Sequence, residues 1–290
     1  MGVARLLESR GMTTAASSTR TTQAVILARG LGTRMRRDNG AVLDAGQATA
    51  AASGAKGMMP FERPFLDYVL SVLGDAGITE TVIVIGPPPD DAAIREYFAT
   101  TAAGRRVTVR FAVQPEPRGT ADALLAARDA VHQAAFLMLN SDNLYPLESC
   151  SVLAALGGAG LVAFDAETLT RESGIEPERV LRYALVDADA DGWLRAIHEK
   201  PDPEHPLARS SQRWVSMNLW SFTPRIFDAC ARVTPSARGE LELADAVTIA
   251  MRDLGERFRV ICMSGAVLDL STRADVAFVG QRLASITPRP

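Results

Sequence analysis

Apolar residues recur along this chain with two periods that alternate. Short runs of β-branched and aliphatic residues predict strands, and apolar residues spaced three and four positions apart predict helices. The predicted strands cover residues 24–28, 81–85, 107–113, 135–139, 161–164, 183–186, 194–199, 213–222 and 258–263. The predicted helices cover residues 65–73, 91–99, 120–131, 147–156, 224–231, 243–254 and 275–284.

This alternation is typical of an α/β fold with a mostly parallel sheet and helices on both faces. In such folds, ligands bind beyond the carboxyl ends of the strands. The loop after the first strand, Gln114 and Asp142 all fall at strand ends of this kind. The length of 290 residues allows one large domain or two small ones.

The loop after the first strand has the groups that a phosphate chain requires. Gly30 and Gly32 allow a ligand to approach the backbone, and Thr33 and Arg34 add a hydroxyl and a guanidinium. A strand, a glycine turn and an arginine are also common in α/β proteins generally, and Met35 replaces the third glycine of the dinucleotide-binding motif. The loop alone therefore leaves its function open.

Charge and composition narrow the class of function. Thirty-one Lys and Arg residues oppose 34 Asp and Glu residues, so the net charge of −3 gives no indication of a nucleic-acid partner. The three cysteines are far apart and support neither a disulfide framework nor a CxxC metal site. Three histidines are too few for a zinc cluster, and we expect no histidine-centred mechanism.

The N-terminal residues 1–22 mix Ser, Thr and Ala with scattered charges and have no apolar core long enough for a signal peptide or membrane span. They predict a disordered leader, and the chain as a whole predicts a cytoplasmic protein without a membrane partner. Residues 36–55 show no regular apolar period and predict a mobile excursion or a short helix.

Several motifs follow one another in a fixed order: VILARGLGTRM, Lys56 with Met59-Pro60, QPEPRGTADA, LNSDN, HEKP, RGELELADA, and Asp269 ahead of Thr272. In this order they resemble the sugar-1-phosphate nucleotidyltransferases, nearest to the glucose-1-phosphate thymidylyl/uridylyltransferase branch. The resemblance implies a three-layer Rossmann-like (GT-A type) fold in one domain, residues 23–290. Its nucleotide-binding part would cover about 23–145 and its sugar-phosphate-binding part about 146–290.

The resemblance also implies which residues bind the nucleotide. The glycine loop and Arg34 would hold the β- and γ-phosphates, Lys56 would lie near the α-phosphate, and Gln114 would read a pyrimidine base, which favours UTP or dTTP. ATP and GTP stay open, because the GTADA sequence also resembles the adenylyl-transferring branch. The implied nucleotide-binding residues are Leu27, Ala28, Gly30, Gly32, Thr33, Arg34, Gln114, Gly119 and Thr120.

The same family match implies a Mg²⁺ site at Asp142 and Asp269, although an aspartate at a strand end is more often a turn former or a helix N-cap. The implied catalytic residues are Arg34, Lys56 and Asp142. The implied sugar-phosphate-binding residues are Asn143, Glu199, Lys200 and Asn218. A surface ion pair is the simpler interpretation of Glu199 and Lys200.

Three residues depart from the family pattern. Arg29 stands where the family usually has Gly or Ala, and Ser141 replaces the common glycine before the metal aspartate. Asn218 replaces a glycine and narrows the sugar pocket. The segment between Arg34 and Lys56 is also longer than usual. These departures leave a second hypothesis, a catalytically silent homologue that senses nucleotides or nucleotide sugars.

The leading hypothesis is an enzyme that makes an NDP-sugar and pyrophosphate from an NTP and a hexose 1-phosphate by Mg²⁺-dependent direct displacement. An NAD-dependent oxidoreductase fits the alternation of strands and helices but not the glycine pattern. The sequence leaves self-association into a homo-oligomer open.

Overall fold

The computed structural model describes residues 20–290. Most of the predicted leader, residues 1–22, lies outside the described residues. Its last residues belong to the packed structure, because the Thr21 amide donates to Ala154 O at 2.8 Å and Thr22 O accepts from the amide of Thr79 at 2.9 Å.

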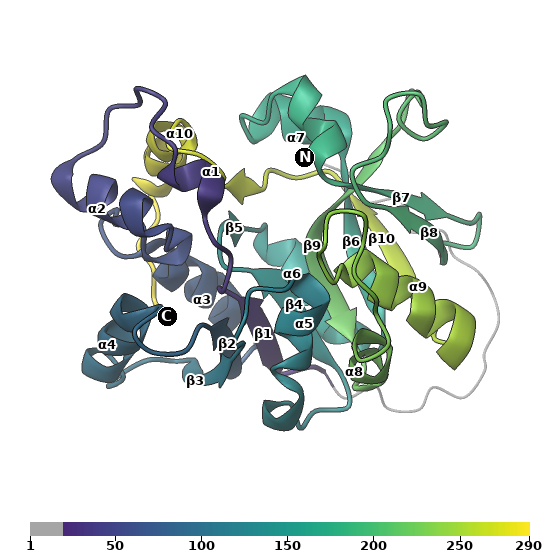
Figure 1. Ribbon diagram of the computed structural model, residues 1–290, viewed down its shortest axis with the longest axis horizontal. Coiled ribbons are helices and arrows are strands. Elements are labelled where there is room, and N and C mark those ends of the chain that lie inside the picture. The colour runs from purple at the N-terminus through teal and green to yellow at the C-terminus, as the bar shows by residue number, and fades with distance from the viewer. Residues whose placement is uncertain (1–19) are drawn as a thin grey trace.

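A nine-stranded sheet forms the centre of the molecule (Figure 1). The main path has the order β10-β6-β9-β4-β1-β2-β3, and β7 joins it at β9 with β8 at its outer side. Strands β4, β1, β2 and β3 are parallel to one another, as are β10 and β6, and β9 runs antiparallel between β4 and β6. The strands are β1 (Gln23–Leu27), β2 (Glu80–Ile85), β3 (Thr108–Val113), β4 (Phe136–Asn140), β6 (Gly160–Asp165), β7 (Ala184–Ala188), β8 (Leu194–His198), β9 (Trp214–Phe222) and β10 (Arg259–Met263).

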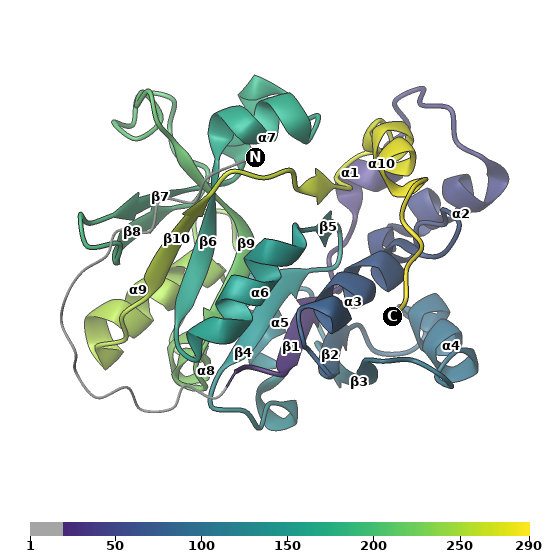
Figure 2. The ribbon, with the colours of Figure 1, turned by 180° about the vertical axis from the view of Figure 1, so that it is seen from behind.

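Helices cover both faces of this sheet, which confirms the predicted α/β class. Figure 1 shows α5, α8 and α9 in front of the strands, and Figure 2 shows α3 and α6 in front of the opposite face. The helices are α1 (Thr33–Arg36), α2 (Ala45–Ser53), α3 (Phe65–Asp75), α4 (Ala92–Thr100), α5 (Thr120–Leu125), α6 (Leu147–Leu156), α7 (Ala166–Glu172), α8 (Arg225–Cys230), α9 (Leu243–Leu254) and α10 (Asp275–Leu283).

Strand β1 shows why both faces are covered. Ala24 and Ile26 belong to the hydrophobic cluster on the α3 and α6 face, whereas Val25 and Leu27 belong to the cluster on the α5 and α9 face. Successive side chains of a strand point to opposite faces, so a continuously apolar strand must be buried on both. The C-terminal end of this central strand carries the glycine loop.

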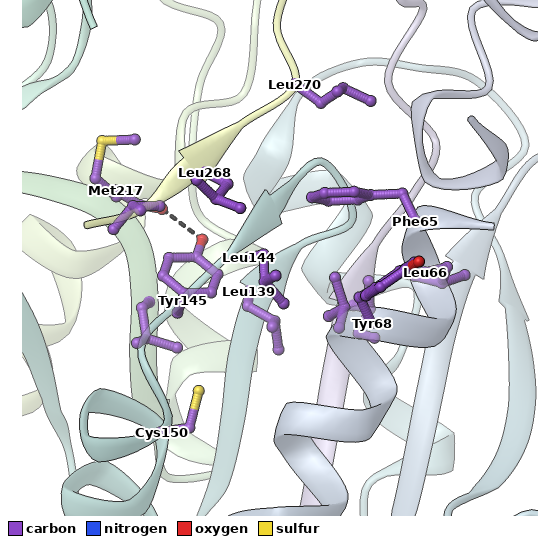
Figure 3. Packing of buried hydrophobic residues seen from close by; sticks show 14 of the residues in the cluster. Phe65, Leu66, Tyr68, Leu139, Leu144, Tyr145, Cys150, Met217, Leu268 and Leu270 are labelled. Atoms are coloured by element: carbon purple, nitrogen blue, oxygen red, sulfur yellow. Dashed lines mark hydrogen bonds between the residues drawn. The ribbon is translucent and has the colours of Figure 1, made fainter. Parts of the chain in front are cut away.

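A short antiparallel pair lies above the main sheet and was not predicted. It joins β5 (Asn143–Leu144) to β11 (Leu268–Asp269), and Leu144 and Leu268 anchor it in the core (Figure 3). Beneath it, the buried Tyr145 hydroxyl donates to Met217 O at 2.6 Å. Strands of two residues carry too short an apolar pattern for recognition from sequence.

Other predicted boundaries hold with small differences. The helix predicted at 120–131 is divided into α5 and a 3₁₀ turn, Arg128–Ala130, and α7 was not predicted. In the segment 36–55, α2 begins with a capping box in which Asp44 accepts from the Gln47 amide at 2.8 Å, so this part is a capped helix. Within residues 20–290, no helix has the length and apolar composition needed to cross a membrane.

Candidate active site

The glycine loop between β1 and α1 is shaped by a close backbone contact. Gly32 has φ of +60°, and a Cβ atom at this position would lie 2.5 Å from Gly54 O. Left-handed φ and this lack of space both require glycine. Gly54 follows α2, so the end of the inserted segment 36–55 packs directly on the loop.

A cavity of about 370 Å³ opens beside this loop. It contains every residue that the sequence assigned to nucleotide binding except Arg34. Its lining also includes Lys56 and Asp142. The predicted residues that line it are Leu27, Ala28, Gly30, Gly32, Thr33, Gln114, Gly119 and Thr120.

The wall opposite the glycine loop is built from the segment after β3. Gln114 is buried, and its backbone amide donates to Ile85 O at 2.9 Å. Gly119 has φ of +130°, and a Cβ atom there would lie 2.5 Å from Leu241 O. The turn between them is therefore fixed against the segment that precedes α9.

Lys56 and Asp142 form an ion pair in the lining of this cavity. The Lys56 Nζ atom lies 2.6 Å from Asp142 Oδ2, and both side chains are largely buried. Lys56 begins a 3₁₀ helix, Lys56–Met58, and Asp142 lies just after β4. The residue between β4 and Asp142 is Ser141, and its amide donates to Leu27 O at 3.1 Å at the end of β1. The loops after two adjacent parallel strands thus meet at this ion pair.

The second carboxylate of the predicted metal site lies close to the first. In the β5 and β11 pair Asp269 is opposite Asn143, and the Leu270 amide donates to Asp142 O at 2.9 Å. Burial raises the pKa of Asp269, and the negative charge of Asp142 raises it further. The structure therefore brings Asp142 and Asp269 close together. They are far apart in the sequence, since 126 residues separate Asp269 from Asn143, the residue after Asp142.

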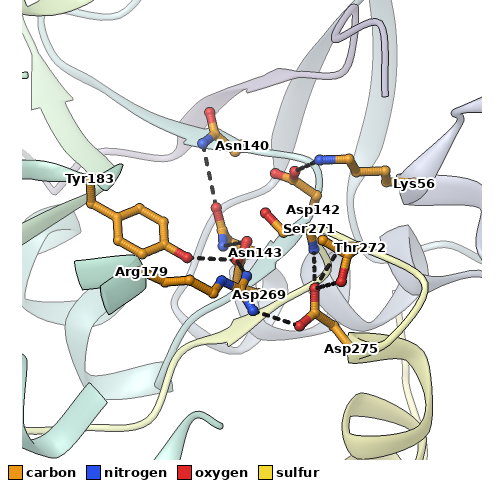
Figure 4. Close-up of polar contacts among 10 residues, drawn as sticks. All are labelled: Lys56, Asn140, Asp142, Asn143, Arg179, Tyr183, Asp269, Ser271, Thr272 and Asp275. Atoms are coloured by element: carbon orange, nitrogen blue, oxygen red, sulfur yellow. Dashed lines mark hydrogen bonds and ion pairs between the residues drawn. The ribbon is translucent and has the colours of Figure 1, made fainter. Parts of the chain in front are cut away.

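Asp269 is held by three donors (Figure 4). Its Oδ2 atom accepts from Arg179 Nη2 at 2.8 Å and from the Tyr183 hydroxyl at 2.7 Å, and its Oδ1 atom accepts from Asn143 Nδ2 at 3.0 Å. Arg179 also contacts Asp275 Oδ1 at 2.8 Å. An aspartate has about four lone-pair positions, so one position on Asp269 stays available to a cation.

The donor set fits a magnesium ion that also binds substrate phosphates. Within the described residues, no group of three or more His, Cys, Asp or Glu side chains is arranged to hold a metal. Mg²⁺ in nucleotide sites is commonly held by one or two carboxylates together with phosphate oxygens and water. Asp142 and Asp269 supply two carboxylates of this kind, and two adjacent negative charges favour a cation between them.

A second cavity, of about 230 Å³, adjoins the first. Thr120, Asn140, Asp142 and Glu240 line both cavities. The second cavity contains all four residues predicted to bind the sugar phosphate, namely Asn143, Glu199, Lys200 and Asn218.

Arg34 lines this second cavity and not the one beside the glycine loop. Successive residues of a helix point about 100° apart, so Thr33 and Arg34 at the start of α1 face different cavities. From the sequence we expected Arg34 to hold the β- and γ-phosphates together with the glycine loop. In the structure Arg34 lines the other cavity.

Two residues of the second cavity have left-handed backbones. Lys200 has φ of +46° and Asn218 has φ of +59°. Non-glycine residues with such φ values concentrate at functional sites, and asparagine tolerates this conformation best. The left-handed backbone at position 218 is one that both glycine and asparagine adopt, so it suits the asparagine present and the glycine that the resemblance led us to expect.

Glu199 and Lys200 lie together, with Nζ 3.6 Å from Oε1. Burial raises the pKa of Glu199, and the Lys200 ammonium opposes that shift. The Glu199 carboxylate is therefore partly desolvated inside a cavity, which differs from the surface ion pair that the dipeptide suggests in isolation.

Arg29, the unusual residue of the loop, reaches across to the end of β2. Its Nη2 atom lies 2.8 Å from Asp90 Oδ2, and its guanidinium packs against Gly86, where a Cβ atom would lie 2.6 Å from Nε. Arg29 therefore joins two loops at the rim of the first cavity. The sequence alone did not indicate this partner.

Sequence reasoning missed Arg179, Arg182 and Tyr183. Arg182 and Tyr183 line the second cavity, and Arg179 lies behind it against Asp269. Arg179 and Arg182 belong to an irregular 3₁₀ segment, Pro177–Arg182, whose sequence has no recognisable period. Tyr183 begins a predicted strand, but nothing in that pattern indicates a contact with Asp269.

Comparison with known proteins gives a consistent result. Residues 51–264 match the family model described as nucleotidyl transferase. The chain is 29% identical to the UTP–glucose-1-phosphate uridylyltransferase AglF of Haloferax volcanii, over 91% of this chain and 98% of that protein. It is 30% identical to a glucose-1-phosphate thymidylyltransferase of Streptomyces griseus, over 91% of this chain and 67% of that protein.

Solved structures share the fold. A UDP-glucose pyrophosphorylase crystallised with UDP-glucose superimposes with a TM-score of 0.70 at 17% identity, covering 91% of this chain and 98% of the other. At this identity the likeness concerns the path of the backbone.

Proposed function

This chain belongs to the nucleotidyl transferase family, and we propose that it transfers a nucleotidyl group from UTP or dTTP to a hexose 1-phosphate. The observation that supports this most directly is the pair of adjoining cavities. One lies beside a glycine loop, the other contains Glu199 and Lys200, and Asp142 lines both. A triphosphate and a sugar phosphate placed in them would meet at Asp142.

The reaction requires little covalent chemistry from the protein. An oxygen of the sugar phosphate attacks the α-phosphorus, the bond from that phosphorus to the bridging oxygen breaks, and pyrophosphate leaves with the electron pair. Both reactants are anions, so the protein must hold them in line and offset their charge.

The chain supplies those functions through specific groups. Backbone N–H groups of the loop at Gly30 to Thr33 would bind phosphate oxygens, and Lys56 would place its ammonium at the junction of the two cavities. Arg34 would serve the sugar phosphate, since it lines the second cavity. Mg²⁺ bound by Asp142 and Asp269 would supply further positive charge beside the phosphates.

The second cavity would orient the sugar. The Glu199 carboxylate accepts hydrogen bonds and suits sugar hydroxyls, whereas the Lys200 ammonium suits a phosphate. Asn143 and Asn218 offer both donors and acceptors at its wall. These groups recognise a hydroxylated ligand with an anionic end, as a hexose 1-phosphate is.

Two departures that motivated a silent sensing homologue have structural explanations. Asn218 has a left-handed φ of +59°, a conformation that glycine also adopts readily, and Arg29 is engaged by Asp90. Neither removes a group that the transfer reaction needs, so the sensing hypothesis receives no support from them.

The test is to incubate the purified protein with Mg²⁺, each common NTP and a panel of hexose 1-phosphates, and to measure pyrophosphate release. We expect release with UTP or dTTP that depends on the sugar phosphate. If every pair yields no pyrophosphate, while calorimetry shows tight nucleotide binding, the protein is a sensor and the proposal is wrong.

A further inference from the structure

Gln114 presents a single orientation of its side-chain amide to the nucleotide cavity. Both hydrogen bonds that this amide makes within residues 20–290 use Nε2, which donates to Asp122 Oδ2 at 2.7 Å and to Gly119 O at 3.2 Å. A carboxylate and a carbonyl oxygen are both acceptors. The NH₂ group must therefore face them, which leaves Oε1 as the free end of the amide.

Asp122 lies behind the Gln114 amide and outside the cavity. It lies in the first turn of α5, is 8% exposed and does not line the cavity, whereas Gln114 does. Its other oxygen, Oδ1, accepts from Arg118 Nη2 at 2.6 Å. A carboxylate accepts hydrogen bonds and donates none, so Asp122 holds the Gln114 amide in one of its two orientations.

This orientation has a consequence for the base. Uracil and thymine carry an N3–H donor, whereas cytosine carries an unprotonated N3 that accepts hydrogen bonds. An amide oxygen that faces the cavity can accept a hydrogen bond from the N3–H group of uracil or thymine. It cannot form one with N3 of cytosine, because both atoms are acceptors. An unmade buried hydrogen bond of this kind weakens binding by roughly tenfold or more.

We propose that Asp122 is a positioning residue that selects uracil or thymine over cytosine by fixing the orientation of the Gln114 amide. The inference rests on the proposed function for the location of the base. Beyond the proposed function, the inference identifies Asp122 as a second residue, behind Gln114, that determines which base binds.

The test compares the wild type with Asp122→Asn and Asp122→Ser. For each protein, calorimetry gives the dissociation constants of UMP and CMP, and pyrophosphate release gives kcat/KM for UTP and CTP with one sugar 1-phosphate. In the wild type the uracil nucleotides are favoured. In Asp122→Asn, the new NH₂ group can donate to Gln114 Oε1 and reverse the amide, so the ratio of uracil to cytosine preference falls by roughly tenfold or more.

Arg118→Ala is the matched control. The Arg118 side chain is 60% exposed and lines neither cavity, and its removal leaves the Asp122 carboxylate in place. In Arg118→Ala the ratio of uracil to cytosine preference should stay at its wild-type value. A ratio measured within one protein is insensitive to partial loss of folded material, since that loss affects both nucleotides equally.

An unchanged ratio in both Asp122 variants, or a wild type that prefers CMP, would overturn the inference. If neither variant folds, binding of 3-methyl-UMP to the wild type decides, because it lacks the N3–H group and must bind at least tenfold more weakly than UMP. If UMP and CMP both fail to bind the wild type, the inference is wrong. A shifted binding ratio without pyrophosphate release would refute the proposed function and support the role of Asp122.

Discussion

The ammonium of Lys56 lies 2.6 Å from Oδ2 of Asp142, at the place where the two cavities meet. Each side chain is held by the charge of the other, so each keeps a defined position before substrate arrives. Removal of either partner leaves a partly buried charge without its counter-ion.

Asp142→Asn should lower turnover by roughly 10²-fold or more, because it removes a charge from the point where the reacting phosphates would meet. The fold should persist with a lowered melting temperature, because the partly buried Lys56 ammonium loses its counter-ion. Pyrophosphate release and thermal unfolding measure the two effects. Asp228→Asn serves as a control, since that carboxylate is 60% exposed and lines neither cavity, and it should behave as the wild type does. A fully active Asp142→Asn protein would refute the proposed role.

Glu199 should show opposite effects on stability and activity. Its pKa is raised by burial, so its contribution to stability is present below the pKa of the unfolded chain and is lost as the pH rises through the raised pKa. Glu199→Gln should therefore raise the melting temperature at pH 8 and leave it unchanged near pH 4. It should also raise KM for the sugar phosphate. Equal melting curves at pH 8 would show that burial of this carboxylate has no energetic cost.

The same group predicts a pH dependence of sugar binding. A raised pKa means that Glu199 is protonated at a higher pH than an ordinary glutamate, and the protonated form is a weaker acceptor. KM for the sugar 1-phosphate should rise as the pH falls through this range, and the dependence should be absent in Glu199→Gln. Initial rates at several pH values, with saturating nucleotide, measure it.

Arg179→Gln should destabilise the protein by about 3 kcal/mol, because it leaves the buried Asp269 and the partly buried Asp275 without their shared cation. Urea unfolding gives this free energy. Arg171→Gln removes an ion-paired arginine whose side chain is 59% exposed, and it should change stability by less than about 0.5 kcal/mol. Comparable losses in both variants would contradict the importance of burial.

Substitutions at two glycines of the loop should separate folding from binding. Gly32→Ala forces a Cβ atom to within 2.5 Å of Gly54 O at a left-handed φ, which should cost more than about 2 kcal/mol of stability. A Cβ atom added at Gly30 would have no neighbour within 4 Å, so Gly30→Ala should leave stability unchanged and weaken nucleotide binding by occupying the cavity. Chemical unfolding and nucleotide calorimetry test both variants.

The sequence predicted most of the fold because its elements have strong local patterns. Strand β1 is apolar at every position after Gln23, and α9 begins and ends where its apolar period does. The short pair of β5 and β11 was missed because its register is decided by distant segments. Helix α5 was predicted too long, since a regular apolar pattern continues past the point where its chain turns.

The candidate site was predictable where one residue type suits one ligand. Glycines beside Thr33, and carboxylates at 142 and 269, fall in or beside the cavities as the motifs suggested. The contacts that join distant segments were not predictable. Arg179 with Asp269, Arg29 with Asp90, and Asp122 with Gln114 depend on side-chain positions that only the folded chain defines.

The β5 and β11 pair also makes the site depend on two segments that are synthesised far apart in time. Asp269 lies 126 residues after Asn143, and Arg273 beyond it donates to Met35 O at 3.0 Å beside the glycine loop. A growing chain that has released its nucleotide half from the ribosome still lacks both residues. The site can therefore be complete only after the segment that carries Asp269 has been made and has packed beside the N-terminal loop, and a chain that stops before it lacks one of the two carboxylates on which transfer would depend.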